Sequence, residues 1–580
     1  MISMQLANEA YKLKLGYGAD APVAPLRLVA ARGDSAAFQL VLCADVAYSV
    51  NTALGDFYAV HGPCRGRANR PEKHERLRVA VRAPFAVRVQ NEEFVTDDDG
   101  VRKADVLLAS TVRESAPDTP SAVWVELQIP TDAKAGDYEV EVTLYAARNS
   151  EDERAVASAV LPLHVAAYTL AAPTEWRFYL DLWQHNSNIA RKHDVPLWSD
   201  AHFAVMEKYV QSLAALGQKA ITVCVSEIPW AGQSSYNAQV FGGDLFEYSM
   251  VTITREADGT FAYDFSPMQR YIDLCRRVGL SGDIEVFGIA NVWPPLENFA
   301  LPLCEEHPEP IRLRYLDKAD GCMKYVRDAA TICDYIKALE QYFIQTEQID
   351  RVRIAADEPA DVERYRKSLS LLEKLTPAFR FKTAINHAEF IEEFGDVIDD
   401  FVPHLACAAE RYDALLHYRA KYPTKRFLWY VCTGYARPNL FLRCPLTEAR
   451  MIGNMTDMLK LDGFLRWSYT VWPEDPRREL RFGHFECGDT NVVYPAYNGD
   501  VLLSLRYKNL QRGIADYELI RAAREKCGDD AVDAIVSRVR HVTDMSEYYR
   551  KMKAREGGLH SNEFEEFNAI KAALLSLLAE

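Results

Sequence analysis

Eight short β-rich runs alternate with helical segments between residues 171 and 510, and few folds accommodate such an alternation. The runs are WRFYLDLWQH, KAITVCVSE, DIEVFGIAN, RVRIAADEP, RFKTAINH, DVIDDFVP, RFLWYVCTG and GFLRWSYT, in chain order. Helical patterns such as HFAVMEKYVQSLAALG and VERYRKSLSLLEKL lie between them. Strand–helix units repeated in this way over about 300 residues favour a (β/α)8 TIM barrel. A doubly wound open sheet is the rival fold, but it usually carries a glycine-rich phosphate turn, and the sequence contains no GxGxxG or Walker motif.

The chain on either side of this region has a different pattern. Residues 1–170 contain runs such as AAFQLVL, AVWVELQIP and DYEVEVTLYAA, in which apolar and polar residues alternate with the period of a half-buried strand. We therefore predict an N-terminal antiparallel β-sandwich. The segment TDAKAG, which contains Gly136, suits a hairpin turn between the last two of these runs. Residues 511–580 have a helical pattern and are predicted to pack on the barrel, so the predicted domains are 1–170, 171–510 and 511–580.

Charge and cysteine content narrow the function classes. The 580 residues include 67 Lys and Arg against 83 Asp and Glu, a formal net charge of −16 at pH 7. An acidic surface repels phosphate groups, so neither nucleic acid nor an anionic membrane is an expected partner. The 12 cysteines show no metal-finger spacing, and Glu9, Lys12 and Lys14 stand where a signal peptide needs an apolar core. We expect a soluble cytoplasmic protein with reduced thiols, and the oligomeric state, a homo-oligomer included, stays open.

The clearest chemical signal is the sequence Asp357-Glu358-Pro359, which ends the fourth β-rich run. The residues before it, RIAA, are mostly small and apolar, so two carboxyl groups arrive together where the barrel opens. Repulsion between adjacent acids raises the pKa of one of them, and a carboxyl group with a raised pKa is a usable general acid. A structural interpretation competes, because Pro359 suits the first turn of a helix and acidic residues favour a helix N-terminus.

Aromatic and amide residues recur at the ends of the other runs. The first run alternates, with Phe178, Leu180 and Leu182 on one face and Tyr179, Asp181, Trp183 and His185 on the other. We expect the first set to face the helices and the second set to face the lumen and mouth of the barrel. A sugar ring stacks on aromatic side chains, and its hydroxyl groups need fixed hydrogen-bond partners. The candidate substrate-binding residues are Asp181, Trp183, Glu227, Trp293, Asn386, His387, Trp429, Tyr430, Trp467, Tyr469 and Trp472.

The second carboxylate of a common glycosidase mechanism is missing. Many retaining barrel glycosidases carry Asn-Glu-Pro at the end of the fourth strand and a glutamate nucleophile at the end of the seventh. Here Asp357 takes the asparagine position, and the seventh run, RFLWYVCTGYARPN, contains no carboxylate. Both features fit substrate-assisted hydrolysis, in which the carbonyl oxygen of a 2-acetamido group attacks C1 while an aspartate holds its N–H. The sequence contains no HExxH motif, and we expect neither a metal nor a cofactor.

The chain resembles glycoside hydrolase family 123, the β-N-acetylgalactosaminidases, in the stretches WRFYLDLWQH, RIAADEP, GFLRWSYTVW and GDTNVVYPAYNGDVLLSLRYKNLQRGIADYELI. The segment AVWVELQIPTDAKAGDYEVEVTL is also similar to the N-terminal sandwich of that family, so the resemblance covers most of the chain. It implies that Glu358 is the general acid/base and that Asp357 orients and stabilises the acetamido group. It also implies a retaining, exo-acting enzyme that releases a β-linked N-acetylhexosamine, foremost N-acetylgalactosamine. Such substrates include glycosphingolipid-type glycans, whereas a cytoplasmic location suggests a short imported oligosaccharide.

Two other functions compete with this one. A glycosidase acting on a sugar without a 2-acetamido group would use Asp357, Glu227 or Asp181 as its nucleophile or base. A non-catalytic barrel would bind a glycan without turnover. In each case the expected partner is an oligosaccharide or a glycoconjugate glycan.

Overall fold

The eight predicted strands are present and form one parallel sheet. Their bounds are β12 Tyr179–Leu182, β13 Ile221–Cys224, β16 Ile284–Phe287, β19 Val352–Asp357, β20 Arg380–Ile385, β21 Asp400–Pro403, β22 Arg426–Tyr430 and β23 Gly463–Arg466. The strand order is β12-β23-β22-β21-β20-β19-β16-β13. A parallel bridge between Leu180 and Gln218, with a 2.9 Å hydrogen bond from the Lys219 amide to the Leu180 carbonyl, brings the first and second strands together. The sheet is therefore curled as in a TIM barrel, which confirms the predicted fold class.

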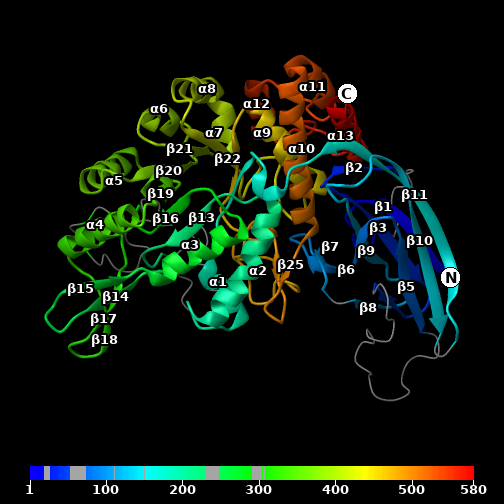
Figure 1. The fold of residues 1–580 in the computed structure, drawn as a ribbon, viewed down its shortest axis with the longest axis horizontal. Helices are drawn as coiled ribbons and strands as arrows, with labels where there is room; N and C mark the ends of the chain where they lie inside the picture. The colour runs from blue at the N-terminus through cyan, green and yellow to red at the C-terminus, as the bar shows by residue number, and fades with distance from the viewer. Residues whose placement is uncertain are drawn as a thin grey trace.

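This computed structural model describes residues 1–17, 26–52, 74–109, 111–148, 151–228, 247–290, 304, 307 and 309–579. Helices connect the strands and cover the outside of the barrel (Figure 1). They are α1 Asn186–His193, α2 Asp200–Leu216, α3 Ser266–Val278, α4 Ala329–Gln345, α5 Val362–Leu375, α6 Phe390–Phe394, α7 Leu405–Glu410, α8 Tyr412–Lys421 and α9 Leu446–Met458. None of the helices in the described ranges combines the length and apolarity needed to cross a bilayer.

The C-terminal part of the chain is helical, as its pattern predicts. Its helices are α10 Leu505–Cys527, α11 Asp529–Val536, α12 Met545–Lys553 and α13 Phe564–Ala579. The predicted boundary between residues 510 and 511 falls inside α10. This helix packs against α9 and so belongs to the outer layer of the barrel as much as to the C-terminal segment.

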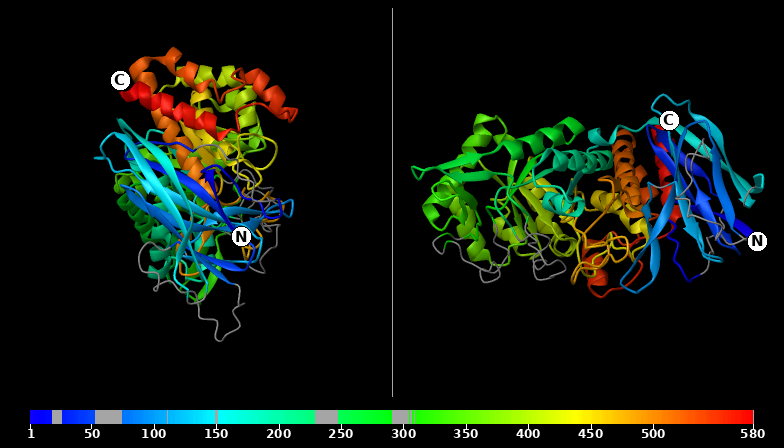
Figure 2. Two further views of the ribbon diagram at one scale, coloured as in Figure 1. Left: turned by 90° about the vertical axis from the view of Figure 1, so that its right-hand side faces the viewer. Right: turned by 90° about the horizontal axis from the view of Figure 1, so that it is seen from below.

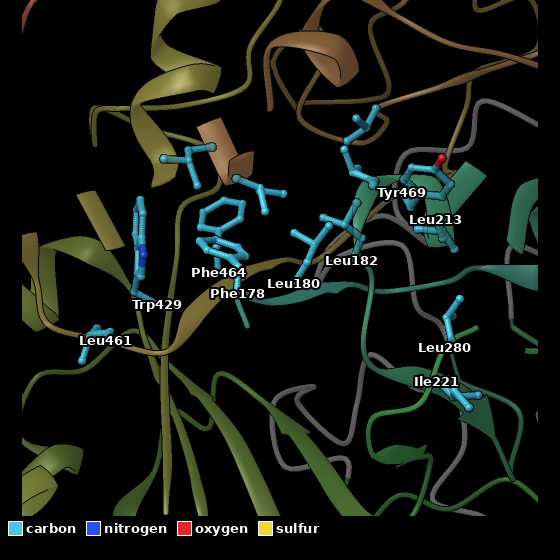
Figure 3. Packing of buried hydrophobic residues seen from close by; sticks show 14 of the residues in the cluster. Phe178, Leu180, Leu182, Leu213, Ile221, Leu280, Trp429, Leu461, Phe464 and Tyr469 are labelled. Carbon is cyan, nitrogen blue, oxygen red and sulfur yellow. The ribbon is translucent and has the colours of Figure 1, made fainter. Parts of the chain in front are cut away.

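Alternation in the first strand orients its side chains as the sequence predicts. Phe178, Leu180 and Leu182 lie in the large core between the sheet and the helices (Figure 3). Tyr179 and Trp183 belong instead to a separate buried cluster inside the barrel. The period of two that separates these sets is the ordinary geometry of a strand.

The two long connections after the second and third strands build a small second sheet. Its strands are β14 Thr252–Arg255 and β15 Phe261–Asp264 from the first connection, and β17 Arg314–Asp317 and β18 Cys322–Tyr325 from the second. The order is β15-β14-β17-β18, and parallel pairing of β14 with β17 ties the two connections together. Residues 229–246 and 291–303 of these connections lie outside the described residues.

The N-terminal region consists of two packed sheets. Their orders are β1-β3-β9-β6-β7 and β2-β11-β10-β5-β4-β8. The bounds are β1 Ile2–Asn8, β2 Leu28–Arg32, β3 Ser35–Ala44, β4 Tyr48–Asn51, β5 Glu75–Arg82, β6 Ala86–Thr96, β7 Arg102–Leu107, β8 Val112–Ser115, β9 Ser121–Gln128, β10 Gly136–Arg148 and β11 Arg154–Thr169. Buried residues from both sheets share one core, as in a β-sandwich. Most strand pairs are antiparallel, but β2 with β11 and β4 with β5 are parallel.

The hairpin expected around Gly136 is wrong. Strand β9 pairs with β3 and β6 in one sheet, whereas β10 pairs with β5 and β11 in the other. The TDAKAG segment therefore crosses from one sheet to the other. Each strand buries one face in the shared core in either arrangement, so alternation along the strands does not distinguish a crossover from a hairpin.

Buried ion pairs join the sandwich to the barrel through α10, which lies between them in Figure 1. Arg512 of this helix lies 2.9 Å from Glu9, and Lys508 lies 2.7 Å from Glu126. Figure 2 shows the C-terminal helix α13 against the sandwich, where it contacts β2 and β11. A buried charge that loses its partner is strongly destabilising, so these pairs fix the orientation of the sandwich against the barrel.

The sandwich also buries a carboxyl group, Glu92 of β6, that has no hydrogen-bond partner among the described residues. Its side chain is 0% exposed, and burial raises its pKa from 4.5 to about 8. The unfolded chain releases this proton near pH 4.5 while the folded protein keeps it to about pH 8, so stability falls as pH rises between these values. We expect Glu92→Gln to remove this fall. The free energy of unfolding of the variant minus that of the wild type should be larger at pH 8 than at pH 5 by about 3 kcal/mol.

Denaturant unfolding of both proteins at pH 5 and pH 8 measures this difference. Glu141→Gln is the matched control, because that side chain is 51% exposed on β10. A gain from Glu92→Gln that is the same at both pH values would mean that the group does not titrate as described.

Candidate active site

Asp357 and Glu358 stand at the end of β19, in the mouth of the barrel. Arg353, Ala355 and Asp357 alternate along β19 and face the lumen, so the same alternation directs Glu358 toward the helices. The φ angle of Glu358 is instead 41°, in the left-handed region, which turns the chain and brings its carboxyl group back to the mouth. This conformation is strained for any residue except glycine, and such strain is concentrated at functional sites.

Two side chains from other strands hold the Glu358 carboxylate. The Tyr430 hydroxyl, at the end of β22, donates to Oε1, and Asn386, which follows β20, donates from Nδ2 to Oε2 at 3.0 Å. His404 packs edge-on against the Tyr430 ring with 5.2 Å between centroids. Burial lowers the pKa of His404 to about 4, so this wall of the site is neutral at neutral pH. Both Glu358 oxygens are therefore oriented by uncharged donors.

Asp357 has the opposite environment. Its side chain is 8% exposed and makes no hydrogen bond or ion pair with any residue that the structure describes. Burial raises its pKa well above the ordinary value, and the neighbouring charge of Glu358 raises it further. Both effects favour a proton on the adjacent pair, and the Asp357 carboxyl group is available to a hydrogen-bond donor on a ligand.

Aromatic rings line the lumen beside the carboxyl pair. Trp183, Tyr430 and Trp467 share one buried cluster with Phe482 and Phe485, which come from the connection after β23. The Trp467 and Phe485 rings lie 5.0 Å apart between centroids. Of the predicted sugar-contacting residues, the structure thus brings Trp183, Tyr430 and Trp467 together inside the barrel.

Asp489 fixes the position of the Trp467 ring from behind. It accepts a hydrogen bond from Trp467 Nε1 at 3.4 Å and forms a fully buried ion pair with Arg466 at 2.7 Å. Burial raises the pKa of Asp489 to about 6. Its carboxylate is engaged with Arg466, and we assign it a positioning role.

Asp181 lies deeper in the lumen than the carboxyl pair. It is fully buried and contacts the ammonium group of Lys382, which also contacts Glu285. These three residues come from β12, β20 and β16 and form a charged layer below the aromatic rings. Asp181 therefore supports the site from beneath.

Two other predicted residues are engaged elsewhere. Glu227, which follows β13, is buried and pairs with Arg312 at 3.0 Å and Arg314 at 2.8 Å. It anchors the start of the small second sheet. The side chain of His387 is 43% exposed and lies 3.8 Å from Glu389, with no described contact to Glu358.

Trp429, Tyr469 and Trp472, which the sequence predicts to contact substrate, have rings that face the helices. Trp429 and Tyr469 lie among the core residues of Figure 3. Trp429 Nε1 donates to Thr456 of α9 at 2.8 Å, and the Tyr469 hydroxyl lies 2.7 Å from Ser212 of α2. Trp472 Nε1 donates to the Val493 carbonyl at 2.8 Å. Trp293 lies outside the described residues.

Potential metal ligands gather at one place among the described residues, away from the carboxyl pair. Asp97, Asp98 and Cys487 offer ligand atoms within 4.8 Å of one another. Lys103 contacts Asp97, and Arg481 lies 2.6 Å from Asp98. These cations already neutralise the carboxylates, so we assign no ion to the group.

Several residues of the site escape sequence reasoning. Lys382 shares the lumen face of its strand with Asn386, and alternation along RFKTAINH is the signal that places it there. Glu285 follows in the same way from DIEVFGIAN. Phe482 and Phe485 lie in an irregular connection without periodicity, so no local pattern indicates that they enter the lumen.

A family model described as the catalytic domain of glycoside hydrolase 123 matches residues 183–523, and the match includes the carboxyl pair. The chain belongs to glycoside hydrolase family 123. This family 123 protein is therefore a glycoside hydrolase, and its substrates are glycans. No curated protein matches the chain significantly.

Solved structures extend the likeness to the whole chain. A family 123 glycoside hydrolase from Clostridium perfringens, described for glycolipid glycan hydrolysis, matches with a TM-score of 0.73 and 16% sequence identity. The match covers 100% of this chain and 97% of that chain, so the sandwich and barrel of the family 123 fold are common to both. A glycoside hydrolase from Bacteroides vulgatus, described as putative, gives a TM-score of 0.33 at 10% identity over 77% of each chain, which is too weak to bear on the site.

Proposed function

We propose that this protein is a retaining, exo-acting β-N-acetylhexosaminidase that uses substrate-assisted catalysis, with N-acetylgalactosamine as the released sugar. The observation that carries the proposal is the contrast between two adjacent carboxyl groups. Glu358 accepts hydrogen bonds from two donors at the mouth. Asp357 is buried and has no hydrogen-bond or ion-pair partner among the described residues. The two donors orient Glu358 at the mouth for proton transfer, and the unpartnered Asp357 can receive the N–H of a buried acetamido substituent.

In the first step the acetamido carbonyl oxygen of the bound sugar attacks C1, and the bond from C1 to the glycosidic oxygen breaks. Asp357 accepts the acetamido N–H, and this hydrogen bond favours its ionised form. The proton retained by the pair then passes to Glu358, which delivers it to the leaving oxygen. The product of this step is a cyclic oxazoline-type intermediate together with the released alcohol.

In the second step Glu358 is ionised and takes a proton from water. The oxygen of this water attacks C1, the ring bond to the acetamido oxygen breaks, and the anomeric configuration is retained after two inversions. Tyr430 and Asn386 hold the Glu358 carboxylate in its accepting state. Trp183 and Trp467 are the proposed stacking rings for the sugar, because they are the predicted tryptophans that share the lumen with Tyr430.

The alternative of a carboxylate nucleophile has less support. Asp181 contacts Lys382, and Glu227 is paired with Arg312 and Arg314. The carboxylates of both candidate nucleophiles are therefore engaged in ion pairs. The described Clostridium perfringens relative is named for glycolipid glycan hydrolysis. We extend this to a substrate class for the present protein, a glycan of the glycolipid type with a terminal β-linked N-acetylhexosamine.

Paired aryl substrates test the mechanism. We expect the nitrophenyl β-N-acetylgalactosaminide to be hydrolysed roughly 100-fold faster than the nitrophenyl β-galactoside, because the galactoside lacks the internal nucleophile. The two compounds differ only at the 2-position, so each serves as the control for the other. Preference for the galactoside, or first release of the α-anomer, would rule out acetamido participation.

A further inference from the structure

A segment of the connection after β23, residues 473–487, is fixed to the sandwich. Arg477 lies 2.6 Å from Glu93 of β6, and Arg481 lies 2.6 Å from Asp98, in the turn between β6 and β7. Both ion pairs cross from the barrel to the sandwich. The backbone of this segment is therefore held in place before any ligand binds.

The same segment separates two spaces. Phe482 and Phe485 point into the lumen cluster, where Phe485 contacts Trp467. The residues on either side of Phe482, Arg481 and Gly483, line a groove on the outer side. The segment is thus a thin wall between the proposed sugar pocket and this groove.

The groove has a volume of about 1060 Å³. It lies between the 473–487 segment, the end of α1 and the turn between β24 Tyr494–Pro495 and β25 Val501–Leu502. The α1 connection follows β12 and the segment follows β23, and these strands are parallel neighbours. Both connections leave the carboxyl end of the barrel, where the site of a TIM barrel is built.

The chemistry of the groove suits a neutral polar ligand. Four basic and four acidic residues line it, so their charges balance, and Lys192 donates to the Pro473 carbonyl at 3.0 Å while Arg477 is paired with Glu93. The Tyr497 ring is 92% exposed, and the Arg477 guanidinium lies 5.1 Å from its centroid. An exposed ring among fixed polar groups offers what the C–H face and hydroxyl groups of a sugar need.

We propose that this groove binds the leaving-group side of a neutral oligosaccharide substrate, with Tyr497 as the ring on which a sugar stacks. The inference rests on the proposed function, because it requires the terminal sugar to occupy the carboxyl pair. An exo-acting hydrolase encloses that sugar and leaves the rest of the glycan outside the mouth. The groove behind the aromatic wall is preformed by the sandwich, so it receives this part of the glycan without rearrangement.

The test compares a nitrophenyl β-N-acetylgalactosaminide with a tetrasaccharide that ends in the same sugar. For Tyr497→Ala we expect the ratio of kcat/KM for the tetrasaccharide to kcat/KM for the aryl glycoside to fall about tenfold. Tyr497→Phe keeps the ring and should keep the ratio. Tyr17→Ala removes another tyrosine with an exposed ring, at 69%, from the sandwich and is the matched control.

Calorimetric titration separates this inference from the proposed function. The tetrasaccharide is added to the Glu358→Gln protein, with and without Tyr497→Ala. We expect Tyr497→Ala to raise the Kd for the tetrasaccharide about tenfold, as it lowers the kcat/KM ratio. An unchanged ratio with an unchanged Kd, or no tetrasaccharide binding at all, overturns the groove as a glycan site. If the wild-type protein does not hydrolyse the aryl acetamido glycoside, the proposed function fails and the titration alone decides the role of the groove.

Discussion

Glu358→Gln is expected to lower kcat/KM for an alkyl β-N-acetylgalactosaminide by about 10³-fold, and for the nitrophenyl glycoside by less than about tenfold. The alkoxide is a poor leaving group and departs only with a proton, whereas nitrophenolate departs without one. Glutamine keeps the shape of Glu358 and one oxygen acceptor, so the contacts with Tyr430 and Asn386 need little change. The difference between the two leaving groups is the signature of a lost general acid.

Initial rates on both glycosides, with the thermal unfolding of each variant, measure this effect. Glu363→Gln is the matched control, because this carboxylate lies in the first turn of α5 with 76% of its side chain exposed. Undiminished hydrolysis of the alkyl glycoside would remove Glu358 as the acid. Equal losses on both glycosides would point to impaired binding or folding, because proton transfer affects the two leaving groups differently.

The barrel was predictable because its strands carry their own signals. Each of the eight runs is short, apolar and bounded by a helical pattern, and βα units of this kind have few ways to close. The local alternation also predicted the faces of the first strand. The path of the chain through the sandwich was not predictable in the same way, because the strands around Gly136 bury the same residues whether they pair with each other or belong to opposite sheets.

The carboxyl pair was predicted, but its geometry was not. Strand alternation alone directs Asp357 and Glu358 to opposite faces. Position 358 is not a glycine, the residue that usually indicates a left-handed conformation. The positive φ of Glu358 is fixed by tertiary contacts, among them the hydrogen bonds from Tyr430 and Asn386. The surrounding fold thus holds a local conformation that the residue itself disfavours.

The aromatic residues illustrate why position along a strand is insufficient. Trp429 and Tyr430 are adjacent, so one must face the helices when the other faces the lumen. The register that decides between them depends on the sheet as a whole, and it directs Tyr430 to the lumen. Tyr469 and Trp472 lie beyond the last strand, where alternation no longer applies, and α2 and the Val493 carbonyl engage them instead.

Lys382→Met is expected to lower the free energy of unfolding by about 3–5 kcal/mol, because it removes the cation between two buried carboxyl groups. Asp181, Glu285 and Lys382 are each fully or almost fully buried in the lumen. Burial and the neighbouring charge of Asp181 raise the pKa of Glu285 well above its ordinary value. The raised pKa favours the protonated, uncharged form of Glu285, which leaves Asp181 as the main carboxylate partner of Lys382.

This proton assignment makes the opposite prediction for Glu285→Gln. Glutamine replaces a carboxyl group whose uncharged form is favoured in the folded barrel, whereas the unfolded wild-type chain releases that proton near the ordinary pKa, so we expect Glu285→Gln to be at least as stable as the wild type at pH 7. Because the raised pKa makes the wild-type protein less stable as pH rises, the variant should gain on the wild type in alkaline solution. Thermal unfolding of both variants from pH 6 to pH 9 measures the contrast. If Glu285→Gln destabilises the barrel as much as Lys382→Met does, both carboxyl groups are ionised in the fold and the charged layer below the site carries a net negative charge.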